Sequence, residues 1–494
     1  MYQNGTSSSV ENNQSPPKRL VTLDVLRGVA IFGMTIVHIS YKLYNAEWLY
    51  EGVSTGLSGL PFYVLILMFV LGYFGTWHGF FLFISSIVNS YVYTRKSREG
   101  LNSKKLLIKN LIAGAIVVVL GYLVEGFGYF GYFGHAIRSG EWNTFNAFLG
   151  ENSWIQTLQI IGLCIILNGI IQYFLMRNSG YEKVKQNLLI YFALIVFVLV
   201  FTPILNNLIA NASFWDSTSS RTWPDIYFVS GNRSVGVWFL TILAGPKDPL
   251  FPYMTSAFVG AMIGIFLANP KPSKKGLTWF ALGGVGMIII GGLLVAFSFL
   301  FNFPLDPRIP FIDTGLPFSI IEEPPTISTY LVRLGGQVCL VMIMFACIEF
   351  RGRGERFANR LVVRYFRRWS SLSLTLYSLQ ILELLPRWLL KISFYNTGVT
   401  DINFMNEYVM GRGTEVYLVL VIIFVLLFYE FVIFILYKVK MVGSLEWFFV
   451  KAQNLFSKVK STKIEPAVCG RSINWVSYIE EPMQIPEEII KIGP

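Results

Sequence analysis

One apolar stretch near the start of the chain carries polar side chains at a spacing that suits chemistry. In RLVTLDVLRGVAIFGMTIVHI, residues 19–39, the polar residues Asp24, Arg27, Thr35 and His38 fall on one face of a helix, within about 80° of arc. Asp24 and Arg27 are three residues apart and can pair, while His38 lies about 21 Å further along the axis. The face is either a polar path along the helix, or an Asp–Arg pair near one end together with a structural histidine.

Histidine is the side chain that titrates nearest to neutral pH, which suits a general base. The chain has three histidines, His38, His78 and His135. All three are therefore candidates for a general base. The competing interpretation of each histidine is a hydrogen-bonded structural group.

A second polar stripe lies in WSSLSLTLYSLQILELLPRW, residues 369–388. On a helix, Ser373, Tyr377, Gln380, Glu383 and Arg387 fall within roughly 120° of arc. Such a stripe faces protein or a water-filled cavity rather than lipid. A structural polar network and a binding site both fit this pattern.

Basic residues gather between Arg351 and Arg368, where the chain has seven arginines. Such a run suits anionic lipid or the phosphate groups of a bound molecule. The alternative interpretation is ordinary topological bias of a membrane protein.

The composition indicates which elements must position these residues. Of the 494 residues 54% are hydrophobic and only 14% are charged, against roughly 25% charged in ordinary soluble domains. This excludes a disordered chain, a disulfide scaffold and an ordinary nucleic-acid-binding domain. The four cysteines contain no C-x-x-C spacing, so we expect no metal site. The sequence predicts an all-α polytopic membrane protein whose main partner is the lipid bilayer.

Runs of about 20 apolar residues predict ten membrane crossings. They are 20–40, 76–93, 106–134, 153–175, 187–209, 251–268, 276–301, 327–350, 369–392 and 414–438. A further apolar stretch, 60–74, is short and is either an eleventh crossing or a segment that enters the bilayer and returns. We expect a disordered cytoplasmic tail over 1–17, a membrane domain over 18–440, and a cytoplasmic interfacial helix and tail over 441–494.

The net charge of +11 is unevenly distributed along the chain. Lysines and arginines follow every second predicted crossing, around 94–109, 177–185, 271–275, 351–368 and 438–463. Because basic connections stay in the cytoplasm, ten crossings place all of them, and both termini, on that side. An eleventh crossing at 60–74 would put Lys18 and Arg19, which precede the first crossing, on the opposite side from these connections. We therefore predict a multi-pass protein of the cell membrane, with 60–74 not spanning.

The first helix also resembles a known family. LDVLRGVAIFGMTIVH is similar to the opening signature of the transmembrane acyltransferases related to heparan-α-glucosaminide N-acetyltransferase, and of the bacterial YeiB-type membrane proteins. The matching positions are Arg19, Leu23, Asp24, Arg27, Gly28 and His38.

Weaker similarities follow in family order across roughly residues 19–450. They are WHGFFLFISSIVNS at 77–90, SWIQTLQIIGL at 153–163, GPKDPLFPYMTSAFVGAMIG at 245–264, LSLTLYSLQ at 372–380 and GSLEWFF at 443–449. One position departs from the pattern: the characterised acetyltransferases have a catalytic histidine shortly before a tryptophan after the first helix. Here Asn45 stands ahead of Trp48.

The resemblance implies transfer of an acyl group from cytoplasmic acetyl-CoA, as co-substrate, to an extracytoplasmic glycan or lipid-linked acceptor. It makes His38 or His78 the base or acyl carrier, with Asp24 and Arg27 ordering the cytoplasmic entrance. The expected phosphate-binding residues are Arg27, Arg364, Arg367 and Arg368. The expected acceptor-binding residues are Asn45, Trp48, Trp77, Gln159, Glu322, Tyr377 and Gln380.

Two other functions remain open from the sequence. One is a multi-pass transporter or exporter of a small polar or lipid-linked solute, and the other is a non-catalytic structural membrane subunit. The sequence also leaves open whether the chain forms homo-oligomers.

Overall fold

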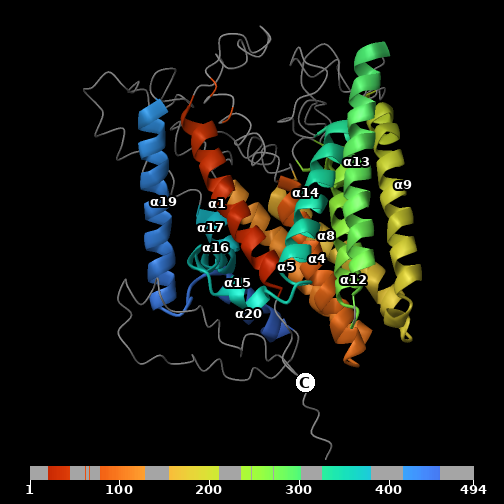
Figure 1. Ribbon diagram of the computed structural model, residues 1–494, viewed down its shortest axis with the longest axis horizontal. Helices are drawn as coiled ribbons and strands as arrows, with labels where there is room; N and C mark the ends of the chain where they lie inside the picture. The colour runs from red at the N-terminus through yellow and green to blue at the C-terminus, as the bar shows by residue number, and fades with distance from the viewer. Residues whose placement is uncertain are drawn as a thin grey trace, which may run out of the picture.

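The computed structural model describes residues 20–44, 62, 66, 78–127, 155–210, 235–245, 248–270, 272–301, 325–379 and 415–456. Every regular element over those ranges is a helix (Figure 1). The predicted all-α class is therefore confirmed.

Eight of these helices are long and apolar enough to cross a membrane. They are α1 (Val21–Leu43), α5 (Ser103–Phe127), α8 (Thr157–Met176), α9 (Val184–Ala210), α12 (Leu250–Leu267), α13 (Lys274–Phe301), α14 (Ile327–Cys347) and α19 (Glu415–Lys438). Each corresponds to a predicted crossing, and together they make the chain a multi-pass membrane protein. Stretch 60–74 lies outside the described residues except for Phe62 and Ile66.

Helix α12 forms the centre of the bundle, with nearly all of its residues buried. Helix α4 (His78–Arg98) packs along it. The approach is close because a Cβ on Gly260 would lie 2.5 Å from the carbonyl oxygen of Phe83, and one on Gly264 would lie 2.4 Å from that of Ile87. Small residues four apart permit such contacts between membrane helices. The serines that lower the apolar character of α4, Ser86 and Ser90, are buried here rather than facing lipid.

Two antiparallel helix pairs flank this centre. Helix α13 packs on α14, where a Cβ on Gly335 would lie 2.5 Å from the carbonyl oxygen of Gly284. Helix α5 packs on α8 in the same way, with Gly162 facing the backbone of Gly114. The outer surfaces of α9, α13 and α19 expose large apolar side chains, as expected for lipid-facing helices.

The described basic connections meet at one end of the bundle. The start of α1 bonds to the end of α14 through Thr22 and Glu349, and the end of α4 bonds to the end of α12 through Arg98 and the carbonyl of Ala268. The antiparallel pairs bring the connections between α4 and α5, α8 and α9, α12 and α13, and α14 and α16 to this same end. We call it the basic end. Its assignment to the cytoplasm remains a prediction.

The ninth predicted crossing, 369–392, differs from the structure. The chain forms the short helix α15 (Gly354–Ala358), then α16 (Leu361–Ser371) and α17 (Ser373–Ser378). Helix α16 therefore begins before residue 369, and the helical conformation is interrupted at Leu372, whose φ is −116° and ψ 22°. Apolar runs alone could not reveal α16, because its inner face carries arginines. Residues 380–392 lie outside the described part of the chain.

Three further helices complete the described structure. Helix α11 (Val235–Ala244) lies between the predicted crossings 187–209 and 251–268, and the single-turn helix η1 (Gly180–Glu182) joins α8 to α9. Helix α20 (Leu445–Phe456) lies within the predicted interfacial segment. Figure 1 shows α15 and α20 toward the lower end of the bundle, near the start of α1.

Candidate functional site

Helices α1 and α16 cross in close backbone contact at Gly28. A Cβ on Gly28 would lie 1.8 Å from the carbonyl oxygen of Phe366, so only glycine fits at this crossing. One turn further along α1, the ring of Phe32 contacts those of Tyr365, Phe366 and Trp369 edge-on. The Arg-Gly pair at 27–28 thus has a structural reason: the glycine brings α16 against the polar residues of α1.

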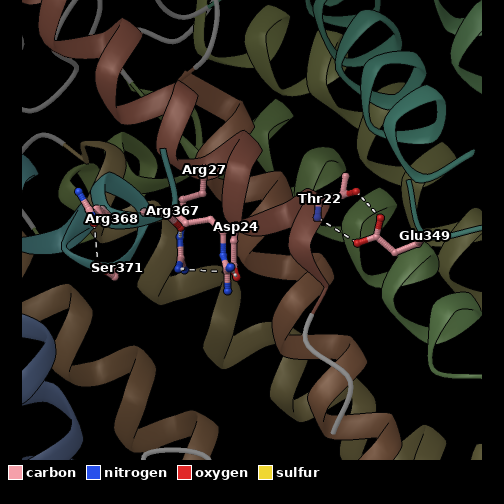
Figure 2. A network of polar contacts seen from close by, with 8 residues as sticks. Thr22, Asp24, Arg27, Glu349, Arg367, Arg368 and Ser371 are labelled. Carbon is pink, nitrogen blue, oxygen red and sulfur yellow. Dashed lines mark hydrogen bonds and ion pairs between the residues drawn. The ribbon is translucent and has the colours of Figure 1, made fainter. Parts of the chain in front are cut away.

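This crossing assembles an arginine cluster, which we define as Asp24, Arg27, Arg364, Arg367 and Arg368. Asp24 Oδ1 lies 3.9 Å from Arg27 Nη2, and Asp24 Oδ2 lies 3.8 Å from Arg367 Nε. Arg27 Nε also donates to Ser370 Oγ at 2.8 Å. Figure 2 shows Asp24 beside the Arg27 and Arg367 side chains, with Arg368 further from it.

The cluster combines partial burial with an excess of positive charge. The side chains of Asp24 and Arg367 are 13% and 14% exposed, and that of Arg27 is 34% exposed. Arg368 is buried, and Arg364 lies one turn before it on the same face of α16. The defined members thus carry four guanidinium groups and one carboxylate, and two of the four, Arg27 and Arg367, lie against Asp24. Guanidinium groups bind phosphate through paired hydrogen bonds, so a phosphorylated ligand is the chemistry this arrangement suits.

Hydrogen bonds hold both ends of α1. At the basic end, the backbone N–H and the hydroxyl of Thr22 both donate to the Glu349 carboxylate, at 3.0 and 2.5 Å, as Figure 2 shows. At the other end, the Tyr44 hydroxyl donates to Glu415 Oε1 at 2.7 Å. Helix α1 is therefore anchored to α14 and α19, which fixes the position of its polar face.

The remaining residues of that face lie away from the cluster. Thr35 is buried and donates its hydroxyl to the Ile31 carbonyl of its own helix at 3.0 Å. His38 is half-buried and lies about 21 Å along the axis from Asp24. The structure thus brings Asp24 and Arg27 together with Arg367, one of the three predicted arginines of α16, and places His38 toward the opposite end of the bundle. His78 begins α4, and its side chain is outside the described residues.

Two of the predicted acceptor-binding residues lie in the described structure, on different helices. Gln159 of α8 is buried against α5, where a Cβ on Gly121 would lie 3.0 Å from its Oε1. Within the described part of the chain this Oε1 has no hydrogen-bond partner. Tyr377 of α17 packs in the apolar cluster between α1 and α19. The others, Asn45, Trp48, Trp77, Glu322 and Gln380, lie outside the described residues.

Glu446 is a residue that reasoning from the sequence missed. Its carboxylate accepts from the backbone N–H groups of Leu374 and Thr375, at 2.7 and 3.1 Å, and from the Thr375 hydroxyl. The backbone N–H of Leu445 donates to the same hydroxyl at 2.9 Å. The motifs LSLTLYSLQ and GSLEWFF are therefore in direct contact, a pairing that neither motif predicts alone. Burial raises the pKa of the Glu446 carboxyl above its ordinary value, although these hydrogen bonds act in the opposite direction.

Asp248, in the junction before α12, is a second overlooked residue. It is 4% exposed, and its Oδ2 accepts from the Thr157 hydroxyl at 2.9 Å. Its backbone N–H donates to the Ile155 carbonyl at 3.1 Å. The contact joins the starts of α8 and α12 at the end opposite the basic end. An acidic residue within a membrane segment is a candidate functional residue, but Asp248 lies outside the predicted crossings, just before 251–268, and so was not among the candidates.

No protein-family model and no curated protein matches the sequence. The described residues contain no group of three or more His, Cys, Asp or Glu side chains arranged to hold a metal ion.

Proposed function

We propose that the protein is a membrane-embedded acyltransferase that uses acyl-CoA, with acetyl-CoA as the expected donor, and transfers the acyl group to an acceptor on the opposite side of the membrane. The observation that carries this proposal is the arginine cluster at the basic end. It brings Arg27 and Arg367 to 3.9 and 3.8 Å from Asp24, with Arg364 and Arg368 on the same helix as Arg367. The two helices are in backbone contact at Gly28.

The cluster suits the phosphate groups of coenzyme A. Arg27, Arg364, Arg367 and Arg368 supply charge-assisted donors, and Asp24 holds Arg27 and Arg367 in orientation. If the basic end is cytoplasmic, as the charge distribution predicts, the donor enters where acyl-CoA is available. The acyl end of the donor then extends along α1 toward His38.

His38 is the proposed general base. It removes the proton from the acceptor hydroxyl or amine, whose oxygen or nitrogen attacks the thioester carbonyl carbon. The carbon–sulfur bond breaks, and the coenzyme A thiolate leaves with the bonding electrons and takes the proton from His38. In a two-step variant, His38 itself accepts the acyl group and passes it on.

The test follows label from acetyl-CoA. Purified full-length protein is incubated with acetyl-labelled acetyl-CoA, and label is sought on protein, glycan and lipid. Arg367→Gln removes contacts of about 1.5–3 kcal/mol, so KM for acetyl-CoA rises roughly ten- to hundredfold with little change in kcat. Arg367→Lys, which keeps the charge, recovers part of this loss, and Lys185→Gln, an exposed charge elsewhere at the basic end, has no effect.

The catalytic assignment is tested separately. His38→Ala lowers kcat by roughly 10²–10⁴ without changing acetyl-CoA binding. Full activity of this variant rejects His38 as the base, and absence of both acetyl-CoA binding and transfer in the wild type rejects the proposed function.

A transporter is the second candidate, favoured by polar contacts inside the bundle. Gln172 of α8 donates to Ser90 of α4 at 2.5 Å, and the Tyr191 hydroxyl of α9 donates to Asn168 of α8 at 3.3 Å. Polar groups buried between membrane helices line substrate pathways in some membrane proteins. Movement of a polar solute into proteoliposomes without acetyl-CoA would favour this candidate over the enzyme.

A further inference from the structure

The arginines that follow α14 divide into two sets that face different surroundings. Arg368 is buried and Arg364 and Arg367 are half-buried, whereas Arg351, Arg353, Arg356 and Arg360 are exposed. We define the outer rim as these four exposed arginines with Leu361 and Val362. Over residues 351–362 the sequence has four arginines and one acidic residue, Glu355, whose side chain is not among those described.

The outer rim belongs to a folded connection. The backbone N–H of Arg353 donates to the Ile348 carbonyl at 2.9 Å, and that of Phe357 donates to the Arg353 carbonyl at 2.8 Å. The Arg360 guanidinium lies 6.0 Å from the centre of the Phe357 ring. Phe357 itself packs with Val21 and Val25 at the start of α1. The charges are thus held beside the ends of two membrane helices, α1 and α14.

Apolar side chains are exposed directly next to these charges. Leu361 is 57% and Val362 is 62% exposed, although Val363, the following residue, is buried against α1. Covering this pair with an apolar neighbour would be favourable, because it removes apolar surface from water. Arginines followed by exposed aliphatic residues match the boundary between lipid headgroups and acyl chains.

We propose that the outer rim binds anionic phospholipid headgroups, with Leu361 and Val362 contacting the acyl chains. Four exposed guanidinium groups favour a net negative headgroup over a zwitterionic one. A free phosphate or a soluble phosphorylated molecule would gain nothing from the two aliphatic side chains, which is why lipid is the occupant that fits. The rim is separate from the arginine cluster, so the proposal stands independently of acyl transfer.

The test measures lipids retained by the full-length protein in detergent, by native mass spectrometry, with added phosphatidylglycerol or phosphatidylcholine. The wild type retains phosphatidylglycerol preferentially. Replacing Arg351, Arg353, Arg356 and Arg360 with glutamine lowers that preference at least about tenfold. Replacing the same four with lysine retains most of it, and unfolding temperatures establish that both variants are folded.

The matched control removes four exposed lysines from other connections of the basic end, Lys104, Lys105, Lys274 and Lys275. It leaves the preference unchanged if the rim is the site, and an equal loss overturns the proposal because any positive surface would then serve. Leu361→Ser with Val362→Ser weakens lipid retention. Unchanged lipid retention in this variant overturns the proposal, because the two aliphatic side chains would then not contact acyl chains. Displacement of phosphatidylglycerol by inorganic phosphate or acetyl-CoA also overturns it, because the rim would then be a site for soluble anions.

Discussion

At the scale of single residues, Glu446 shows how a buried carboxylate ties a terminal helix to the bundle. It accepts two backbone N–H groups at the start of α17 and the Thr375 hydroxyl. The free backbone N–H groups at the start of a helix favour a negatively charged partner. The opposing cost is burial of the charge, which raises the pKa of this carboxyl.

We expect Glu446→Ala to destabilise the protein, because a buried donor left without an acceptor costs about 1–3 kcal/mol. Glu446→Gln keeps an acceptor oxygen and removes the buried charge, so its unfolding temperature near neutral pH is equal to or above that of the wild type. Thermal unfolding in detergent measures both. Equal destabilisation by the two substitutions would show that the charge itself is required.

The pH dependence of folding stability provides a second test of the Glu446 contact. A carboxyl whose pKa is higher in the folded state binds its proton more tightly there. Its stabilising contribution is therefore fully present below the ordinary value of 4.5 and is lost as pH rises through the raised folded value. The wild type should lose stability relative to Glu446→Gln over that pH range, and a difference that stays constant would contradict the raised pKa.

At the scale of elements, the crossing of α1 and α16 depends on one glycine. In Gly28→Ala, the new Cβ would overlap the Phe366 carbonyl oxygen at 1.8 Å, so α16 must move. Overpacking of this kind costs about 1–3 kcal/mol, and the shift separates Asp24 from Arg367. We expect a lower unfolding temperature and weaker acetyl-CoA binding.

Gly283→Ala is the matched control for this prediction. Gly283 lies in α13 with nothing within 4 Å of its added Cβ. Alanine is favoured over glycine inside a helix by about 0.5–1 kcal/mol, so this variant keeps or gains stability. If Gly28→Ala behaves like Gly283→Ala, the close crossing is not required.

The elements differ in how far the sequence could predict them. The eight long helices could be predicted because lipid selects apolar residues around most of a helix. Helix α16 could not, because three of its residues are arginines and an apolar run therefore does not mark its start. The Asp24–Arg27 pair follows from a spacing of three, whereas the contact of Asp24 with Arg367 joins residues that only the tertiary fold brings together. The contact between Glu446 and Thr375 was hidden for the same reason.

At the scale of the whole molecule, the bundle has two chemically different ends. The described basic connections, the arginine cluster and the outer rim share one end, while Asp248 with Thr157 and Tyr44 with Glu415 mark the other. The proposed reaction needs this polarity, because the donor enters at the basic end and the acceptor approaches from the opposite one. Orientation in the membrane is therefore a functional prediction as well as a topological one.

Cysteine labelling in a variant without native cysteines tests that orientation. We choose Lys185→Cys at the basic end and Val235→Cys at the start of α11, because both positions are exposed. Basic connections remain cytoplasmic, so a membrane-impermeant thiol reagent applied to intact cells labels Cys at 235 and leaves Cys at 185 unmodified. Opened membranes provide the control, since both positions are then labelled. The reverse pattern in intact cells would place the arginine cluster outside, where acyl-CoA is not supplied, and would remove the main support for the proposed acyl transfer.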